Sequence, residues 1–337
     1  MKSYRVAIMG ATGLVGQELI KVLEQRSFPL SSVRLFASDH TAGKKLFFHH
    51  QELTVEEPGP DSFRGMELVF FCGGADVSRY FAPLAVRAGA TVIDSSATFN
   101  METPVPLVVP EVNPEDVEGH KGIIASPSPA TIPLVLVLNP LHRVNPVRKV
   151  TLATYQSVSE NGAPALEELT EQTKQVLEGQ NIIPHVYPHQ IAFNLLPEVD
   201  VFLDNGYTRE EWRLFQESQK IMHAGDLLVS ATCVRVPLFT GHSMALHVEL
   251  SRPMSLDEVR QVLVHAPGVK IQDDPTISLY PQPWAAIGTD EVYVGRIRQD
   301  ASHSSGLVLW AVTDNLRKGA ALNSVQLAEE LIKREQI

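Results

Sequence analysis

Three evenly spaced glycines form the clearest chemical motif near the start of the chain. Gly10, Gly13 and Gly16 lie between a short apolar run at residues 6–9 and an amphipathic stretch that follows. Glycine lets the backbone approach a pyrophosphate, and the first turn of a helix supplies N–H donors and a positive dipole end. The spacing differs from G-x-G-x-x-G, so the motif favours a nucleotide site but also fits a tight turn without a ligand.

The loop after the next predicted strand is the one that would meet an adenosine ribose. It runs from Ala37 to Lys44 and contains Asp39, whose carboxylate could accept a hydrogen bond from a ribose 2′-hydroxyl and so favours NAD. A solvated turn aspartate is at least as good an interpretation. No arginine stands in this loop to meet a 2′-phosphate, and His40 and Lys44 are weaker candidates.

The sequence contains two thiols, Cys72 and Cys233. Cys72 follows one predicted strand and Cys233 lies within another, so both are expected in the core. Two cysteines cannot form a disulfide framework, which agrees with a reducing compartment.

Short apolar strands alternate with helical stretches in the first part of the chain. Candidate strands lie at residues 6–9, 33–37, 68–71, 91–93 and 122–125. This alternation predicts an α/β domain with a Rossmann-like, doubly wound parallel sheet. We expect this dinucleotide-binding domain to comprise residues 1–128 and, through a returning helix at about 314–333, residues 314–337.

The pattern changes after Ser126 and predicts a second, α+β domain with a mixed sheet over residues 129–313. A helix is expected at about 129–141 and further helices at 163–177 and 209–222. Alternating, β-branched runs predict strands at residues 150–155, 227–237, 244–250 and 292–296.

Composition excludes some classes of partner. The net charge is −11 and Lys and Arg form no cluster, which argues against a nucleic acid or an anionic membrane as partner. No apolar run reaches the roughly 20 residues needed to cross a bilayer. We expect a cytoplasmic protein, with no metal site.

Several long runs resemble aspartate-semialdehyde dehydrogenases, in order along nearly the whole chain. These runs are residues 10–16, 106–113, 154–159, 192–194, 230–237, 241–243 and 314–320. On them the chain is identified as a member of this family, and it most resembles a paralogue of the enzyme. The resemblance implies a homodimer formed through the second domain, NADP or NAD as cofactor, and a small ligand resembling an acidic amino-acid derivative.

The resemblance also assigns cofactor-binding positions. They are Gly10, Thr12, Gly13, Leu14, Val15, Gly16, Ser38, Asp39, His40, Thr41 and Asn315.

The resemblance fails at the nucleophile. In the family a cysteine thiolate attacks the aldehyde, hydride leaves to NADP, and phosphate resolves the thioester; here the matching position is Pro129. Proline carries no nucleophile, so this covalent chemistry is excluded. Proline suits the first turn of a helix, and we interpret Ser128 as its N-cap rather than as a substitute nucleophile, which would need an adjacent base.

Other positions match the family by type. Gln156 matches the glutamine that orients the acyl intermediate, and His242 matches the acid/base histidine. Arg235 matches the arginine that binds the substrate carboxylate, a contact suited to guanidinium. Glu217 and Lys220 match a pair that meets the substrate amine and the phosphate. Read without the resemblance, these five residues are better explained as surface ion pairs or structural polar groups.

Three further departures cluster around the same positions. Asn100 stands where the family has a phosphate-binding arginine, and His40 stands where it has the arginine for the 2′-phosphate. Glu160 replaces a small residue and adds bulk and charge near the site.

Two hypotheses therefore remain open. The first is a non-catalytic or regulatory member of the family, unable to form the thioester. The alternative is an oxidoreductase of altered chemistry, acting with NAD(P) on a small acidic carbonyl compound, with His242 as the acid.

Overall fold

The computed structural model describes residues 2–337, and the chain divides into two compact units. The first unit extends to Ser128 and includes Ala320–Ile337, and the second is Pro129–Gly319. Within residues 2–337, none of the helices combines the length and the apolar character that crossing a membrane requires.

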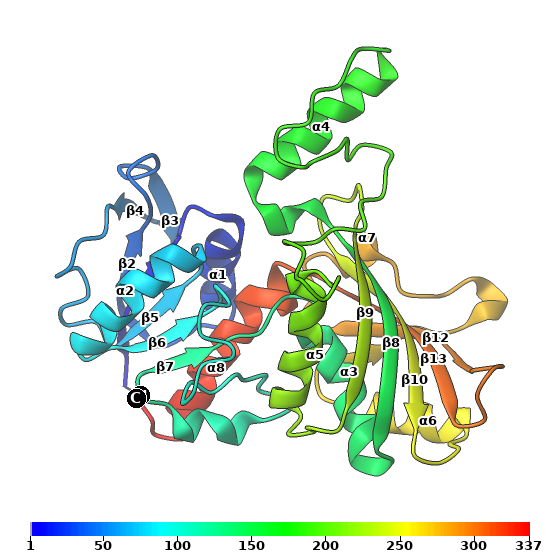
Figure 1. Cartoon of the computed structure of the whole chain (residues 1–337). Coiled ribbons are helices and arrows are strands. Elements are labelled where there is room, and N and C mark those ends of the chain that lie inside the picture. The colour runs from blue at the N-terminus through cyan, green and yellow to red at the C-terminus, as the bar shows by residue number, and fades with distance from the viewer. Residues whose placement is uncertain (1) are drawn as a thin grey trace. The chain divides into compact units, whose positions relative to one another are not determined.

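The first unit contains a seven-stranded sheet. Its strands are β1 (Tyr4–Met9), β2 (Leu30–Phe36), β3 (Lys45–Phe48), β4 (Gln51–Glu56), β5 (Leu68–Phe71), β6 (Thr91–Asp94) and β7 (Ile123–Ala125). They lie in the order β3-β4-β2-β1-β5-β6-β7, and all neighbours are parallel except β3 and β4 (Figure 1). The predicted Rossmann-like sheet is confirmed, and the β3–β4 hairpin adds an antiparallel edge strand.

Helices cover both faces of this sheet because alternate strand residues point to opposite sides. The helices are α1 (Leu14–Gln25), α2 (Ala75–Arg87), α8 (Leu322–Lys333) and the short 3₁₀ helix η1 (Pro114–Gly119). Val6 and Ile8 of β1 share a core with α1 and α8, whereas Ala7 and Met9 pack in the core that includes α2. Since β1 lies between β2 and β5, the strand order reverses there, which opens a crevice at the strand ends.

The second unit contains a six-stranded mixed sheet. Its strands are β8 (Val147–Gln156), β9 (Leu228–Arg235), β10 (His242–Leu250), β11 (Val269–Ile271), β12 (Val292–Gln299) and β13 (Gly306–Thr313). They lie in the order β11-β12-β13-β10-β8-β9, with β8–β9 and β11–β12 parallel and the other pairs antiparallel. The predicted second domain with a mixed sheet is confirmed.

The helices of the second unit are α3 (Thr131–Val144), α4 (Ala163–Leu177), α5 (Arg209–Ile221), α6 (Leu256–Val264) and α7 (Pro283–Ala286), with the short elements η2 (Val158–Asn161), η3 (Pro275–Ile277) and η4 (Arg317–Ala321). Helix α4 projects away from the sheet (Figure 1). Among the other helices, α3 packs between α5 and α6, and all three contact the sheet. On the opposite face, Tyr155 and Trp310 remain half-buried, with their ring centroids 5.5 Å apart.

The predicted last helix is wrong over its first part. Residues from Asp314 do not form a regular α-helix, because the Asp314 Oδ1 atom accepts hydrogen bonds from the backbone N–H groups of Leu316 and Arg317, at 2.9 and 3.0 Å. A π-helical turn, η4, follows, and α8 begins only at Leu322.

Candidate functional site

A cavity of about 480 Å³ lies in the first unit, at the crevice where the strand order reverses. The glycine-containing turn contributes Gly10, Thr12 and Gly13, and the loop after β2 contributes Ser38 and Asp39. The end of β5 and the start of α2 complete the lining on the other side of β1. The volume lies within the range of small-molecule and cofactor sites.

Backbone packing explains two of the three glycines. Gly10 has a φ of +86°, and a Cβ there would lie 2.9 Å from the carbonyl carbon of Cys72. A Cβ on Gly16 would lie 2.2 Å from the Gly10 carbonyl oxygen. Gly13 is exposed and is the N-cap of α1, with no side-chain cap on that helix end. The open cavity, the uncapped helix start and the carboxylate of Asp39 in the lining together fit a dinucleotide.

The remaining predicted cofactor residues of this unit lie around the cavity rather than in its lining. Leu14 and Val15 open α1, and Val15 packs on the core. The Thr41 Oγ1 atom lies 3.0 Å from Thr12 Oγ1, which ties the loop to the glycine turn. His40 is 89% exposed and its backbone N–H donates to Asp39 Oδ1 at 2.8 Å.

In the second unit, the ends of four neighbouring strands bring the predicted residues together. Gln156 ends β8 and stands opposite Arg235, which ends the parallel strand β9. His242 begins β10, which runs antiparallel to β8, and pairs with Thr313 at the end of β13. Asn315 lies two residues after Thr313. One edge of the sheet therefore collects side chains that are far apart in the sequence.

A buried hydrogen-bond network fixes this edge. Ser157 Oγ donates to Asn315 Oδ1 at 3.1 Å, and the Gly241 N–H donates to the same oxygen at 2.8 Å. Asn315 Nδ2 donates to Ser159 Oγ at 2.9 Å. The Ser157 N–H donates to His242 Nδ1 at 3.3 Å, so that nitrogen is an acceptor and the neutral ring carries its proton on Nε2.

Glu160 enters this network and pairs with Arg235. Glu160 Oε2 accepts from Arg235 Nη1 at 2.7 Å and lies 3.6 Å from His242 Nε2. The same Nη1 donates to the Ser157 carbonyl at 2.8 Å. Burial by itself would raise the pKa of Glu160, but the Arg235 charge and the contact with His242 outweigh burial and lower that pKa to about 2. The carboxylate is therefore ionised at neutral pH.

Two buried polar atoms of this cluster, Gln156 Oε1 and Arg235 Nε, have no hydrogen-bond partner among the described residues, and His242 Nε2 has only the Glu160 carboxylate at 3.6 Å, beyond hydrogen-bond distance. Leaving a buried polar group unpaired costs about 1–3 kcal/mol. An acceptor and two donors without a hydrogen bond at one sheet edge make this edge the candidate site for a polar ligand.

The loop before α3 differs from the prediction. The helix begins at Thr131, with Ala130 as N-cap and no side-chain cap, so the predicted start at Pro129 and the predicted capping role of Ser128 are both wrong. In the first turn of α3, Thr131 Oγ1 donates to Glu217 Oε2 on α5 at 2.7 Å. Pro129 is half-buried against Gly319, where a Cβ would lie 3.2 Å from the proline Cβ.

The other predicted substrate-binding residues have different environments. Glu217 is fully buried, and Lys220, one turn later on α5, is half-buried. Asn100 is buried in the first unit and follows the turn after β6.

Neither cysteine is available as a thiolate. Burial, assisted by the Asp94 charge, raises the pKa of Cys72 to about 12. Cys72 nevertheless lines the cavity of the first unit, so its predicted place in the core is only half right. Cys233 is fully buried in β9, and burial raises its pKa well above the usual range.

Sequence reasoning missed two features of this cluster. The sequence predicts Glu160 near the site as added bulk and charge, but not as the partner of Arg235, which lies 75 residues later. Tyr187 carries no sequence signal; burial raises its pKa to about 12, and the Arg235 and Glu160 charges act on its hydroxyl. The sequence signal for Glu160 is a carboxylate where the family has a small residue. No local sequence pattern indicates that Tyr187 lies near Arg235.

Comparison with known proteins covers both units. Residues 5–120 match the family described as "Semialdehyde dehydrogenase, NAD binding domain", and residues 138–318 match "Semialdehyde dehydrogenase, dimerisation domain". An aspartate-semialdehyde dehydrogenase of Bacillus subtilis (strain 168) is 46% identical over 340 residues, covering 98% of each chain.

Two solved structures extend the comparison. Aspartate semialdehyde dehydrogenase II of Vibrio cholerae, complexed with ASA, has a TM-score of 0.96 and 39% identity, covering 99% of each chain. The enzyme of Candida albicans with NADP has a TM-score of 0.77 and 26% identity, covering all of both chains. The NAD-binding family match supports NAD or NADP as the cofactor. The chain belongs to the aspartate-semialdehyde dehydrogenase family.

Proposed function

We propose that this chain is a member of the family that retains the nucleotide fold and the polar ligand site but cannot form the thioester. The observation that carries the proposal is Pro129 at the position of the nucleophile, while both thiols of the chain are held protonated by burial. The division into a dinucleotide-binding domain of 1–128 with 314–337 and a substrate domain of 129–313 belongs to the same proposal. The two free cysteines support a reducing compartment such as the cytoplasm.

The purified chain is expected to lack phosphate-dependent oxidation of aspartate semialdehyde. The reason is the missing thiolate, without which no acyl intermediate is available to phosphate. The measurement is reduction of NAD and NADP with semialdehyde and phosphate, beside an aspartate-semialdehyde dehydrogenase as positive control. Turnover above about 1 per second that requires both compounds would contradict the proposal.

We propose specific roles for the residues at the sheet edge. Arg235 binds an acidic group of the ligand, Gln156 Oε1 accepts a hydrogen bond from an N–H or O–H group of the ligand, and His242 Nε2–H donates to the ligand's carbonyl oxygen. Glu217 and Lys220 contact the amine and an anion. In the first unit, the residues around the glycine turn hold NAD or NADP, which supplies or accepts hydride when bound.

The second candidate is a phosphate-independent oxidoreductase acting on a small acidic carbonyl compound. The His242 Nε2 atom favours it, because that atom has no hydrogen-bond partner among the described residues and a direct carbonyl reduction needs a proton donor but no thiol. Oxidation of NADH or NADPH by short acidic aldehydes, without phosphate, would support this candidate. A His242→Asn variant should then lose that activity.

We expect NAD to bind at least as tightly as NADP. Asp39 lines the cavity and repels a 2′-phosphate, and His40 is directed into solvent beside it. Because Asp39 is 68% exposed, Asp39→Ser should strengthen NADP binding by only about two- to fivefold. Calorimetric titration measures both affinities. Asp76→Ser, an exposed position on α2, is the charge-matched control, and tighter NADP binding by the wild type would reject the expectation.

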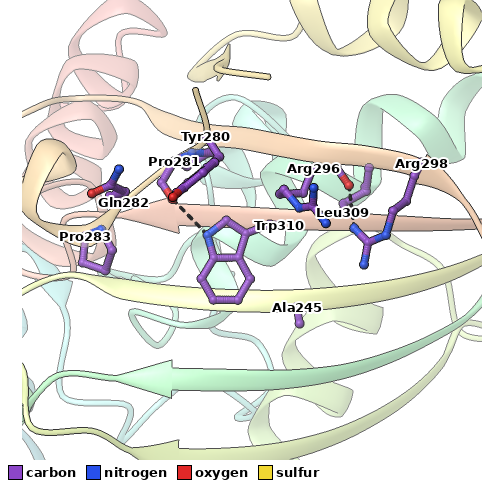
Figure 2. A pocket seen from close by; sticks show the side chains of 9 residues that line it. All are labelled: Ala245, Tyr280, Pro281, Gln282, Pro283, Arg296, Arg298, Leu309 and Trp310. Atoms are coloured by element: carbon purple, nitrogen blue, oxygen red, sulfur yellow. Dashed lines mark hydrogen bonds between the residues drawn. The ribbon is translucent and has the colours of Figure 1, made fainter. Parts of the chain in front are cut away.

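We propose a homodimer formed through the open face of the second sheet. A cavity of about 430 Å³ lies on that face, beside Ala245 and Trp310, where Trp310 Nε1 donates to the Pro281 carbonyl at 3.1 Å (Figure 2). The match to the family's dimerisation domain supports the same surface.

Light scattering at micromolar protein is therefore expected to give twice the monomer mass of 37.1 kDa. Ala245→Arg would place a charge in this cavity and shift the monomer–dimer equilibrium toward the monomer. Thr170→Arg, at an exposed position of α4, is the control. A monomeric wild type would exclude the dimer.

A further inference from the structure

Arg235 already has a carboxylate partner within the chain. The Arg235 side chain is 3% exposed and the Glu160 side chain is 21% exposed, so Glu160 is the more accessible partner of this pair. A guanidinium of this kind is the usual recognition group for carboxylates, because its planar N–H groups match two oxygens. Glu160 therefore occupies the position that suits the acidic group of a ligand.

The surroundings distinguish this contact from an ordinary structural ion pair. The Arg235 Nη1 atom that binds Glu160 also donates to the Ser157 carbonyl, and Arg235 Nε has no hydrogen-bond partner among the residues described. Gln156 Oε1 is unpaired at the same sheet edge, and His242 Nε2 makes no hydrogen bond there but lies 3.6 Å from the Glu160 carboxylate. A structural pair would leave its neighbours satisfied. Glu160 instead accepts from Arg235 Nη1 only, while Arg235 Nε keeps a free N–H that a ligand can bind.

We propose that Glu160 is a built-in occupant of the Arg235 site, so that a carboxylate ligand binds only by displacing it. The proposal rests on the proposed function in taking Arg235 as a ligand-binding group. A tethered carboxylate competes at a high effective concentration, because no translational freedom is lost when it binds. The pKa of Glu160, about 2, keeps its carboxylate charged at neutral pH. Glu160 therefore competes with a carboxylate ligand throughout the neutral pH range. Glu160 is thus a specificity-determining residue that weakens binding of small acids.

The test is calorimetric titration of succinate into the full chain and three variants. Glu160→Gly removes the competitor, and the Kd for succinate should fall about ten- to a hundredfold, the effect of one charge-assisted contact. Glu160→Gln keeps the shape but not the charge and should give a smaller decrease. Glu167→Gln removes the same charge from an exposed position of α4 and should match the wild type.

Cooperative thermal unfolding establishes that each variant is folded. If Glu160→Gly does not fold, the succinate affinity of Glu160→Gln tests whether Glu160 competes with the ligand. Equal succinate affinity in wild type and folded Glu160 variants, including no binding by any of them, would overturn the proposal. So would an equal gain in Glu167→Gln, which would assign the effect to net charge. Phosphate-dependent turnover by the wild type would overturn the proposed function and leave this comparison of affinities intact.

Discussion

Pro129→Cys is expected to give a chain that aspartate semialdehyde labels covalently but that turns over slowly. Position 129 lies immediately before the N-cap of α3, where the helix dipole lowers the pKa of a thiol and makes thiolate available. Gln156, Arg235 and His242 would then act as proposed. Intact-mass spectrometry after reaction in the presence of NADP measures the adduct, and Pro129→Ser, which lacks the thiol, is the control.

Slow turnover is expected because phosphate must resolve the acyl group, and we propose that Asn100 stands where the family has its phosphate-binding arginine. One lost charge-assisted contact corresponds to about 1.5–3 kcal/mol, or roughly ten- to a hundredfold in rate. Adding Asn100→Arg should therefore raise phosphate-dependent turnover by that factor and change the rate of acylation less. Burst amplitude and steady-state rate separate the two effects.

Two outcomes would require revision. If Pro129→Cys turns over as fast as the double variant, the argument about Asn100 is wrong. A second outcome is that neither Pro129→Cys nor the double variant forms an adduct. If adding Glu160→Gly to Pro129→Cys also gives no adduct, the roles proposed for Gln156, Arg235 and His242 must be withdrawn.

Gly16→Ala is expected to destabilise the first unit by at least about 3 kcal/mol, as severe overpacking does. The new Cβ would lie 2.2 Å from the Gly10 carbonyl oxygen and 2.8 Å from the Ala11 Cα. Both neighbours are backbone atoms, so the turn itself must move and the cavity must change shape. Urea unfolding measures the loss of stability, and a decrease in NAD affinity should accompany it.

Gly74→Ala is the matched control for this prediction. Gly74 is the N-cap of α2 and has a φ of −70°, and no atom lies within 4 Å of the place that a Cβ would take there. Its replacement should change the free energy of unfolding by less than about 1 kcal/mol. An unchanged urea midpoint in Gly16→Ala would contradict the prediction, because it would show that the turn accommodates a Cβ with no loss in the free energy of unfolding.

The sequence by itself determined the elements whose signals are local. The apolar run of β5 and the helix α5, which begins with a capping box between Thr208 and Glu211, are both predicted at or near their observed bounds. Periodicity and capping depend on residues within a few positions of one another, so they can be read without tertiary structure. The proposal that Pro129 stands at the position of the nucleophile likewise comes from the family motifs in the sequence.

Only the tertiary structure decided what the side chains contact. The register of β8, β9 and β10 brings Gln156, Arg235 and His242 to one sheet edge, and the turn of η2 sends Glu160 onto Arg235 rather than into solvent. At the start of α3, Thr131 likewise bonds to a group distant in the sequence, Glu217 on α5. These contacts join residues 75 or more positions apart, and their geometry is set by strand pairing and burial, which a local pattern does not specify.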